Sequence, residues 1–324
     1  DCPFDEREFR HSLQSIKKVE GSTFVAKRVN WSSGSEYSGW DDTTASDIVE
    51  PWTPWYVMND AKEVYICLEP GLNVDGTRKQ SIVEPNWGVH APMSPETDPN
   101  APMFNVREWW KPFETADGYI WKYSFSLRPE NIYQYLSSNH IPVQKAEIDL
   151  PTGDSIEDLQ TTVRDEAIGG QILRATIIDA GTGHSTIPTI NIHGDGNNAV
   201  AVAEIDPNTG VVTKIKMTNY GSGYTHASFE IIGGVTTTIA QAVVTSQAGL
   251  GFDPIDDLKT SSVMTNIKPD GDVGGTFITL NTFRQMGLIK NPLKSDGTPY
   301  VGASVKTLPS ITLVLLTPVV ISKS

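Results

Sequence analysis

Residues 104–127 read FNVREWWKPFETADGYIWKYSFSL, and this stretch decides the fold class. Asp117 and Gly118 form a tight-turn signal, because both residue types tolerate the positive φ that two-residue hairpin turns need. After the turn, aromatic residues alternate with other residues from Tyr119 to Phe125, which is the period-two pattern of a β-strand. Such a strand must bury its aromatic face, and each fully buried ring contributes roughly 1.5–3 kcal/mol. We therefore expect this hairpin to form the centre of a β core.

Further elements are predicted on both sides of this hairpin. Short alternating or β-rich runs predict strands over residues 23–29, 55–59, 63–68, 263–267, 276–281, 283–293 and 310–316. Apolar residues at helical spacing predict helices over residues 5–18 and 130–138, and a third that begins at Ser155 and is stopped by Gly169 and Gly170. Residues 69–103 are rich in proline and show little periodicity. Loops of this length are usually binding surfaces or are ordered by a partner.

The middle of the chain contains an internal duplication. Residues 175–194 (ATIIDAGTGHSTIPTINIHG) align with residues 215–234 (IKMTNYGSGYTHASFEIIGG) at an offset of 40 residues. The alignment pairs Gly181 with Gly221, Gly183 with Gly223, His184 with Tyr224, and Gly194 with Gly234. Each copy reads as a strand, a Gly-x-Gly turn, a strand, a glycine turn and an alternating strand (199–205 and 239–245). Neither copy could bury its apolar face alone, so we expect the two to pack into one all-β unit.

These patterns predict a mainly β architecture. We expect a layered antiparallel β-sandwich core with short helices, formed by residues 1–150 and 247–324. Residues 151–169 would be a connecting helix, and residues 170–246 would be an inserted all-β unit built from the Gly-x-Gly repeat. The paired glycines are expected at positions that demand positive φ or close backbone approach.

Composition and charge exclude several functional classes. The formal net charge is −14, and the chain has no Lys- or Arg-rich patch of the kind that phosphate contacts need, so we expect no nucleic-acid partner. The same charge disfavours anionic membrane surfaces, and no apolar run reaches about 18 residues, the length of a membrane-spanning helix. Cys2 and Cys67 are the two cysteines, and we interpret them as reduced, packed thiols, with a disulfide left open.

No motif predicts a metal or nucleotide site. The histidines His11, His90, His140, His184, His193 and His226 lack metal-ligand spacing, and we interpret them as surface or hydrogen-bonded residues. Asp270-Gly271-Asp272 lacks the further oxygen ligands of a calcium loop, so a hairpin turn is favoured. Gly194-Asp195-Gly196-Asn197-Asn198-Ala199 matches the dinucleotide fingerprint in letters, but a strand pattern follows where that motif requires a helix. We expect it to be a turn between strands.

The tryptophans and carboxylates leave one alternative open. All eight tryptophans lie between Trp31 and Trp121. They could form a sugar-stacking platform, but core and interface positions are the favoured interpretation. Asp41, Asp42, Asp47, Glu108 and Glu114 lie near tryptophans, and paired acids on a β-sandwich would suit glycoside hydrolysis. An acidic surface that promotes solubility is the simpler interpretation.

Several stretches together resemble the baseplate wedge subunits of contractile-tailed, T-even-like bacteriophages. They occur in the family's order and cover roughly the first 150 and the last 75 residues. The stretches are VNWSSGSEYSGWDD (29–42), PWYVMNDAKEVYICLEP (54–70), KPFETADGYIWKYSFSL (111–127) with HIPV (140–143), GLGFDPIDDLKTSSVMTNI (249–267) and FRQMGLIKNPL (283–293). The family's shortest members lack the Gly-Ser-Gly-Tyr unit, which resembles repeats found in phage tail proteins generally. The opening residues do not match the family's amino-terminal region.

The resemblance implies a structural role. The chain would be a homodimeric β-sandwich subunit of the virion, assembled in the host cytoplasm with other baseplate wedge proteins around the tail hub. It implies no catalytic residues, no cofactor, no metal and no small-molecule substrate, and our own search of the residues gives no catalytic set. The alternative is a carbohydrate-binding tail adhesin or depolymerase, a glycoside hydrolase on the same β-sandwich.

Overall fold

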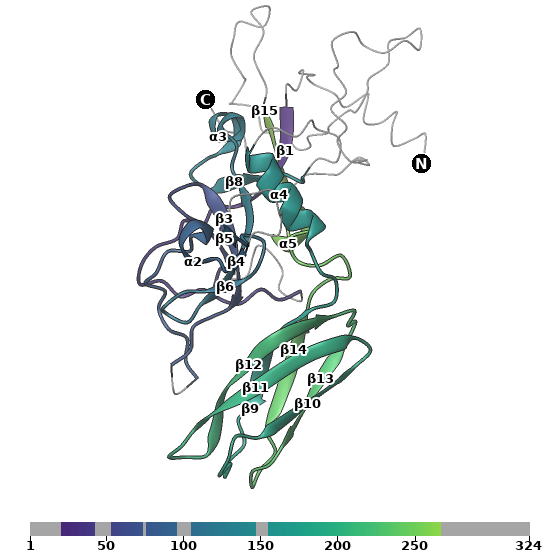
Figure 1. Cartoon of the computed structure of the whole chain (residues 1–324). Coiled ribbons are helices and arrows are strands. Elements are labelled where there is room, and N and C mark those ends of the chain that lie inside the picture. Colours follow the sequence, from purple (N-terminus) through teal and green to yellow (C-terminus); the bar gives the residue numbers. More distant parts are fainter. Residues whose placement is uncertain (1–20, 43–52, 74–75, 96–104, 147–154, 267–324) are drawn as a thin grey trace, which may run out of the picture. The chain divides into compact units, whose positions relative to one another are not determined.

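The computed structural model describes residues 21–42, 53–73, 76–95, 105–146 and 155–266 (Figure 1). Its secondary structure is mainly antiparallel β with a few short helices, which confirms the predicted fold class. The chain forms two compact units, residues 26–260 and residues 1–25 with 261–324. Residues 170–246 belong to the same unit as residues 26–169. The domain boundaries drawn from the sequence therefore stay predictions.

The unit that contains both ends of the chain is described at one strand pair. β1 (Gly21–Lys27) begins in this unit and runs antiparallel to β15 (Ser262–Asn266), with Thr23 opposite Met264. Met264 is buried. The strands predicted at residues 23–29 and 263–267 are thus confirmed. The elements predicted at residues 5–18, 276–281, 283–293 and 310–316 lie outside the described residues.

The larger unit contains a four-stranded antiparallel sheet. Its order is β2 (Tyr56–Met58), β3 (Glu63–Glu69), β7 (Ile120–Ser126) and β6 (Phe113–Glu114). β7 lies between β3 and β6, so the strand expected at the centre of the core is central in the sheet. Both faces of β7 are buried, including Lys122 and Ser124, because the helix α4 packs against this strand.

The turn before β7 differs from the prediction. The prediction of a two-residue turn with positive φ at both Asp117 and Gly118 is wrong. Of these two residues, only Gly118 has positive φ, at +86°. The Gly118 N–H donates to Thr115 O at 2.8 Å, and the Thr115 N–H donates to Tyr119 O at 2.9 Å. This is a longer loop closed by a left-handed glycine, which leaves Asp117 free to use its side chain elsewhere.

The aromatic residues of the sheet form one packed cluster. Tyr119 stacks on Trp121, with ring centroids 5.6 Å apart, and Tyr37 meets both rings edge-on. Tyr65 contacts Phe113 and Tyr123 in the same edge-on way. These centroid distances lie in the range in which aromatic pairs gain energy beyond their buried area. Cys67 is a free thiol buried in this cluster, and Cys2 lies outside the described residues.

Short helices and strands complete the larger unit. They are α2 (Trp87–His90), β4 (Met93–Pro95), β5 (Asn105–Arg107), α3 (Pro129–Tyr135), β8 (His140–Val143), α4 (Ser155–Asp165) and α5 (Pro254–Asp257). The helices predicted after Pro129 and from Ser155 are confirmed as α3 and α4. The pattern did not predict α2, β4 or β5, which lie in or next to the proline-rich stretch, nor did it predict α5.

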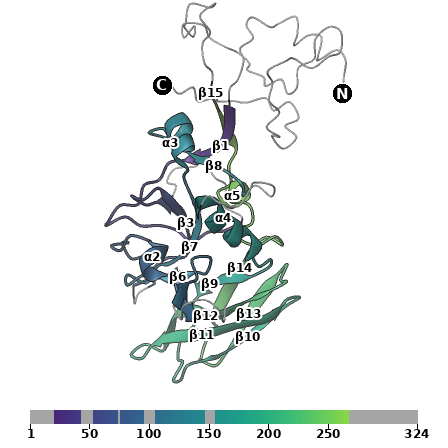
Figure 2. The same ribbon diagram turned by 45° about the horizontal axis from the view of Figure 1, so that its top comes forward.

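Residues 172–244 form six strands that group together in both ribbon views (Figures 1 and 2). They are β9 (Ile172–Asp179), β10 (Thr189–Gly194), β11 (Asn197–Asp206), β12 (Val211–Ser222), β13 (Ala227–Ile232) and β14 (Ile239–Val244). One antiparallel sheet has the order β10-β13-β14-β9, and the other pairs β11 with β12. β9 also contacts β12, and β10 contacts β11. Strands of the first half thus pair with strands of the second half.

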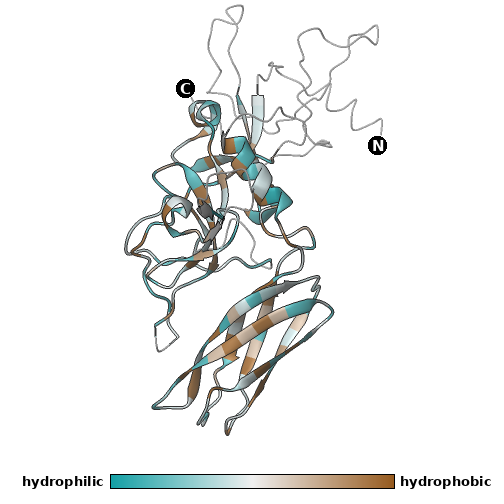
Figure 3. Ribbon diagram, in the orientation of Figure 1, coloured by the Kyte–Doolittle hydropathy of each residue, from teal (hydrophilic) through white to brown (hydrophobic). Residues whose placement is uncertain are grey.

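This unit buries a core of small aliphatic side chains. Apolar and polar residues alternate along its strands (Figure 3). The buried cluster contains Ile172, Ala201, Ala203, Val212, Ile215, Met217, Tyr224 and Ile231. Because each half contributes strands to both sheets, neither half could enclose this cluster alone.

The two Gly-x-Gly turns have the same local geometry. Gly181 and Gly183 have φ of +61° and +75°, and Gly221 and Gly223 have φ of +66° and +76°. The positive φ predicted at these four glycines is therefore confirmed. The backbone N–H groups of Gly181 and Gly221 each donate to the side chain two residues earlier, at Asp179 and Asn219, over 3.0 Å.

Equivalent backbone contacts also occur outside the aligned stretches. The His184 N–H donates to Gly210 O, and the Tyr224 N–H donates to Gly170 O, both over 3.0 Å. Gly170 and Gly210 are again forty residues apart. The two ends of the unit lie side by side, because the Gly170 N–H donates to Ser246 O at 3.0 Å.

Candidate functional site

The tryptophans mainly serve packing. Trp40, Trp55 and Trp121 are at most 2% exposed. Trp31, Trp87, Trp109 and Trp110 are partly buried, and Trp52 lies outside the described residues. The ring planes of Trp87 and Trp109 are inclined to each other by 56°, and those of Trp109 and Trp110 by 90°. The three rings therefore do not form a coplanar row for stacking on sugars.

The acidic residues near the tryptophans are divided among separate contacts. Asp41 pairs with Arg174 at 3.3 Å, Glu108 with Lys111 at 2.6 Å, and Glu114 with Lys216 at 2.8 Å. Asp42 is exposed, and Asp47 lies outside the described residues. Each of the three paired carboxylates thus has its own cation, an arrangement that suits ion pairing between segments better than paired acid–base chemistry.

Four of the histidines make ordinary hydrogen bonds or ring contacts. His90 stacks on Phe113, and His184 Nε2 lies 3.1 Å from Thr238 Oγ1. His193 and His226 lie next to Glu230 and Asp195. His140 is partly buried and its Nδ1 has no hydrogen-bond partner, while His11 lies outside the described residues. Within the described ranges, no group of three or more His, Cys, Asp or Glu residues could hold a metal ion.

The dinucleotide-like stretch is a turn between strands, as predicted. β10 ends at Gly194 and β11 begins at Asn197, so no helix follows the glycines. Asp195 accepts hydrogen bonds from the backbone and hydroxyl of Thr225, which fixes the turn. Asp270-Gly271-Asp272 lies outside the described residues.

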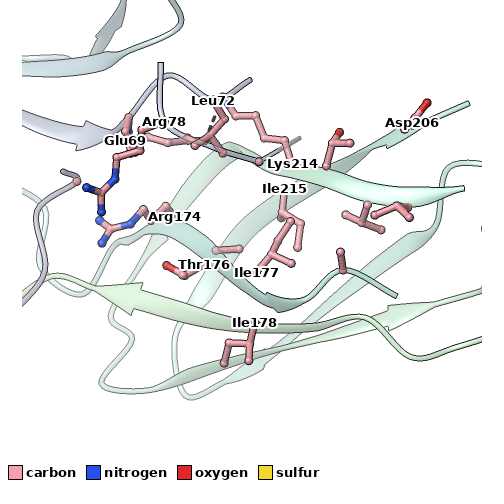
Figure 4. A pocket seen from close by; sticks show the side chains of 18 of the residues that line it. Glu69, Leu72, Arg78, Arg174, Thr176, Ile177, Ile178, Asp206, Lys214 and Ile215 are labelled. Atoms are coloured by element: carbon pink, nitrogen blue, oxygen red, sulfur yellow. Dashed lines mark ion pairs between the residues drawn. The ribbon is translucent and has the colours of Figure 1, made fainter. Parts of the chain in front are cut away.

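A cleft of about 730 Å³ lies in the larger unit, between the aromatic core and strands β9 and β12. The residues of one wall are Ser38, Gly39, Asp41, Glu69, Pro70, Leu72, Gly76 and Arg78, and most of the other wall comes from β9 and β12 (Figure 4). Its volume lies in the range of about 300–1,000 Å³ that small-molecule sites occupy. Charged side chains and aliphatic side chains both line it, so the cleft is the candidate functional site.

Arg174 fixes the two walls of the cleft to each other. Its Nη1 donates to Trp40 O and, at 3.2 Å, to Leu68 O, and its Nη2 lies 3.3 Å from Asp41 Oδ2. Gly39 makes this approach possible, because a Cβ there would lie 2.7 Å from Arg174 Nη1. Burial lowers the pKa of Arg174, and the nearby charge of Arg78 lowers it further, while Asp41 opposes both effects. A buried guanidinium group must be hydrogen-bonded, and the backbone carbonyls of Trp40 and Leu68 are its acceptors.

A second ion pair crosses the cleft. Lys214 Nζ on β12 lies 3.1 Å from Glu69 Oε1 at the end of β3. Glu69 is 5% exposed, and burial raises its pKa while Lys214 opposes the rise. A buried carboxylate without its cation would be costly, so this pair couples the position of β12 to that of β3.

A buried acid–base pair lies outside the cleft. Lys122 on β7 and Asp257 on α5 are both at most 6% exposed. Burial lowers the pKa of Lys122 to about 8 and raises that of Asp257 to about 7. Asp257 Oδ2 accepts the Gly251 N–H at 2.7 Å, and Asp257 O accepts Trp40 Nε1 at 2.9 Å. These bonds fix residues 251–257 against the aromatic core.

Residues 81–93 form a surface that the core holds in place. Asp117 Oδ2 accepts the N–H groups of Ile82 at 2.8 Å and Val83 at 3.0 Å. Trp87 donates from its backbone to Tyr65 Oη and from its ring to Glu63 Oε1, both over 3.0 Å. Ile82, Val89 and Met93 are nevertheless 64%, 62% and 53% exposed. We call residues 81–93 the apolar loop surface.

Sequence reasoning missed the charged residues of the cleft. Arg78, Arg174, Glu69 and Lys214 were not singled out, because no motif connects them. Arg174 offers one signal, since it is a cation in β9 next to the apolar residues Ile172, Leu173 and Ala175. A charge in such a strand needs a partner from another segment.

Comparison with known proteins gives no relative: no family model, no curated protein and no solved structure matches this chain. Within the described part of the chain, no helix is both long and apolar enough to cross a membrane.

Proposed function

We propose that the chain is a structural subunit of a phage tail baseplate wedge, which forms a homodimer and assembles with other wedge proteins around the tail hub. It works in the virion without catalysis. The resemblance of the sequence to wedge subunits suggests this role. The observation that carries it is the apolar loop surface, residues 81–93.

The apolar loop surface combines exposure with fixed geometry. Three large apolar side chains face solvent from a loop whose backbone is bonded to buried side chains of the core. Exposed apolar groups on a fixed backbone favour association, because little conformational entropy remains to be lost on binding. Assembly interfaces of permanent complexes commonly bury more than about 2,000 Å², so this surface would be one part of a larger contact.

The direct test is to find the particle that contains the chain. Fractionation of the producing cells on a density gradient, followed by mass spectrometry, should place the chain in a large assembly with unrelated proteins. Light scattering on the purified chain should give twice the chain mass. A monomer that is absent from every large particle would contradict the proposal.

Variants can assign the assembly to the apolar loop surface. Val89→Asp places a charge on this surface without removing a core contact, so it should block assembly and leave the melting temperature unchanged. Val200→Asp on β11 is the matched control, since Val200 is 50% exposed on a different part of the chain. If both variants assemble equally well, the apolar loop surface is not part of the interface.

The alternative function, a carbohydrate-binding adhesin or depolymerase, rests on the partial exposure of Trp87, Trp109 and Trp110. A glycan array with the purified chain tests it. Binding that is lost in Trp110→Ala would favour this alternative. Trp110 is the suitable position because Trp87 also bonds Glu63, which would confound the result.

A further inference from the structure

Arg78 is a cation without a partner in the cleft. Its side chain is exposed and makes no hydrogen bond or ion pair with any residue that the structure describes. The other two cations that line the cleft are paired, Arg174 with Asp41 and Lys214 with Glu69. One positive charge is therefore left over where the two walls meet.

The unpaired arginine lies beside a second guanidinium group. Figure 4 shows Arg78 and Arg174 converging from opposite walls. Burial is the main cause that lowers the pKa of Arg174, and the charge of Arg78 acts in the same direction with a smaller effect. Two like charges that converge repel each other unless an anion lies between them. Arg174 Nε donates no hydrogen bond to the described residues, although Nη1 and Nη2 do.

The local charge count favours a monoanion. Three acids and three cations line the cleft, but Asp206, the acid outside the two ion pairs, lies at the end away from the arginines and is bound within its own turn by the N–H of Asn208 and the hydroxyl of Thr209 (Figure 4). A single carboxylate would balance Arg78, whereas a phosphate dianion would leave negative charge close to Glu69. Guanidinium groups bind planar carboxylates through two parallel hydrogen bonds.

The rest of the cleft is suited to an aliphatic group. Leu72 and Ile177 are among the residues that line it (Figure 4). We propose that the cleft binds an aliphatic carboxylate, whose charged end lies between Arg78 and Arg174 and whose chain contacts these side chains. This inference is independent of the proposed structural role.

The test uses the full chain and hexanoate as the probe, with binding measured by calorimetry. Arg78→Gln should weaken hexanoate binding by about tenfold or more, because the charged partner is lost. Lys79→Gln is the matched control, since Lys79 is exposed next to Arg78 but does not line this cleft, and it should change binding by less than about twofold. Neither exposed side chain has a bonding partner among the residues that the structure describes, so both variants should keep the parent melting temperature.

A neutral probe isolates the carboxylate. Hexanamide has nearly the same shape without the charge, and it should bind at least about tenfold more weakly than hexanoate to the parent chain. Absence of hexanoate binding would overturn the proposal, as would binding that survives Arg78→Gln. Inorganic phosphate that binds more tightly than hexanoate and depends on Arg78 would overturn the assignment to carboxylates.

Discussion

The aromatic core and the repeat unit of the larger compact unit solve the same problem of burial with different residues. The core, within residues 26–169, encloses large rings and buries Asp117, Glu69 and Lys122 among them. The repeat unit, residues 170–246, encloses mostly alanine, valine and isoleucine, and its turns depend on glycine. The difference shows that the core of large rings fixes its loops with buried polar side chains, while the small-residue strands are joined by positive-φ glycine turns that exposed or half-buried side chains such as Asp179 and Asn219 support.

Deletion of residues 171–245 is the largest change that tests this comparison. Gly170 and Ser246 are joined by a hydrogen bond, so a short Gly-Ser bridge can replace the unit. Because the two regions have separate buried clusters, we expect the remaining core to fold and to keep its near-ultraviolet circular dichroism. An insoluble product would show that the core needs the repeat unit in order to fold.

Trp121→Ala should be the most damaging single substitution. Trp121 is fully buried on the central strand, so its loss should lower the free energy of unfolding by about 3–5 kcal/mol. Denaturant unfolding followed by far-ultraviolet circular dichroism measures the change. Trp110→Ala, at a partly buried position, should cost clearly less. Melting of Trp121→Ala within a degree or two of the parent would show that β7 is not the core strand.

Asp117→Ala should cost about 2–3 kcal/mol, because buried donors lose a charged acceptor. Burial alone would raise the pKa of Asp117, but hydrogen bonds from Thr115, Val83 and Ile82 outweigh it and the pKa lies below its ordinary value of 3.8. A lowered pKa in the folded state means that this stabilisation is present above about pH 4 and is lost as the pH falls further. The free energy of unfolding, measured between roughly pH 3 and 6, should therefore fall more steeply with decreasing pH in the parent than in Asp117→Ala.

Gly221→Ala and Gly223→Ala together separate two effects in one turn, backbone strain from positive φ and steric contact of the added Cβ. Both glycines have positive φ, which costs alanine about 1–2 kcal/mol. A Cβ on Gly221 would also lie 2.6 Å from Asn197 O, whereas the nearest atom to one on Gly223 is 4.0 Å away. Gly221→Ala should therefore be the more destabilising by thermal melting, and equal melting temperatures would show that the turn relaxes.

Lys216→Gln should have the smallest effect. Lys216 and Glu114 connect the repeat unit to the core, but their side chains are 36% and 45% exposed. Solvent screening limits such a pair to less than about 1 kcal/mol. The melting temperature of Lys216→Gln should be close to that of the parent in low and in high salt. A large decrease would mean that the ion pair is shielded from solvent.

Local patterns predicted the strands well and the cleft not at all. Period-two alternation indicated β7, and the predicted strand at 199–205 lies within β11 while that at 239–245 nearly coincides with β14. α5 could have been found, since Asp253 caps it and Pro254 follows as its first residue. Arg174 could not be placed, because its acceptors at Trp40 and Leu68 are more than a hundred residues away and leave no mark on the local pattern.

The exchange of strands between the two halves of the repeat has a consequence for synthesis. Ile172 in β9 pairs with Val244 in β14, so the first strand of the unit must wait for the last to leave the ribosome. Val244 follows Ile172 by 72 residues, and at about 5–20 residues per second their synthesis takes roughly 4–14 s. During this time β9 and β10 have unpaired edges, while β11 and β12 can already close as a hairpin. The nascent chain is therefore exposed to wrong partners until β13 and β14, which follow the second Gly-x-Gly turn, have left the ribosome.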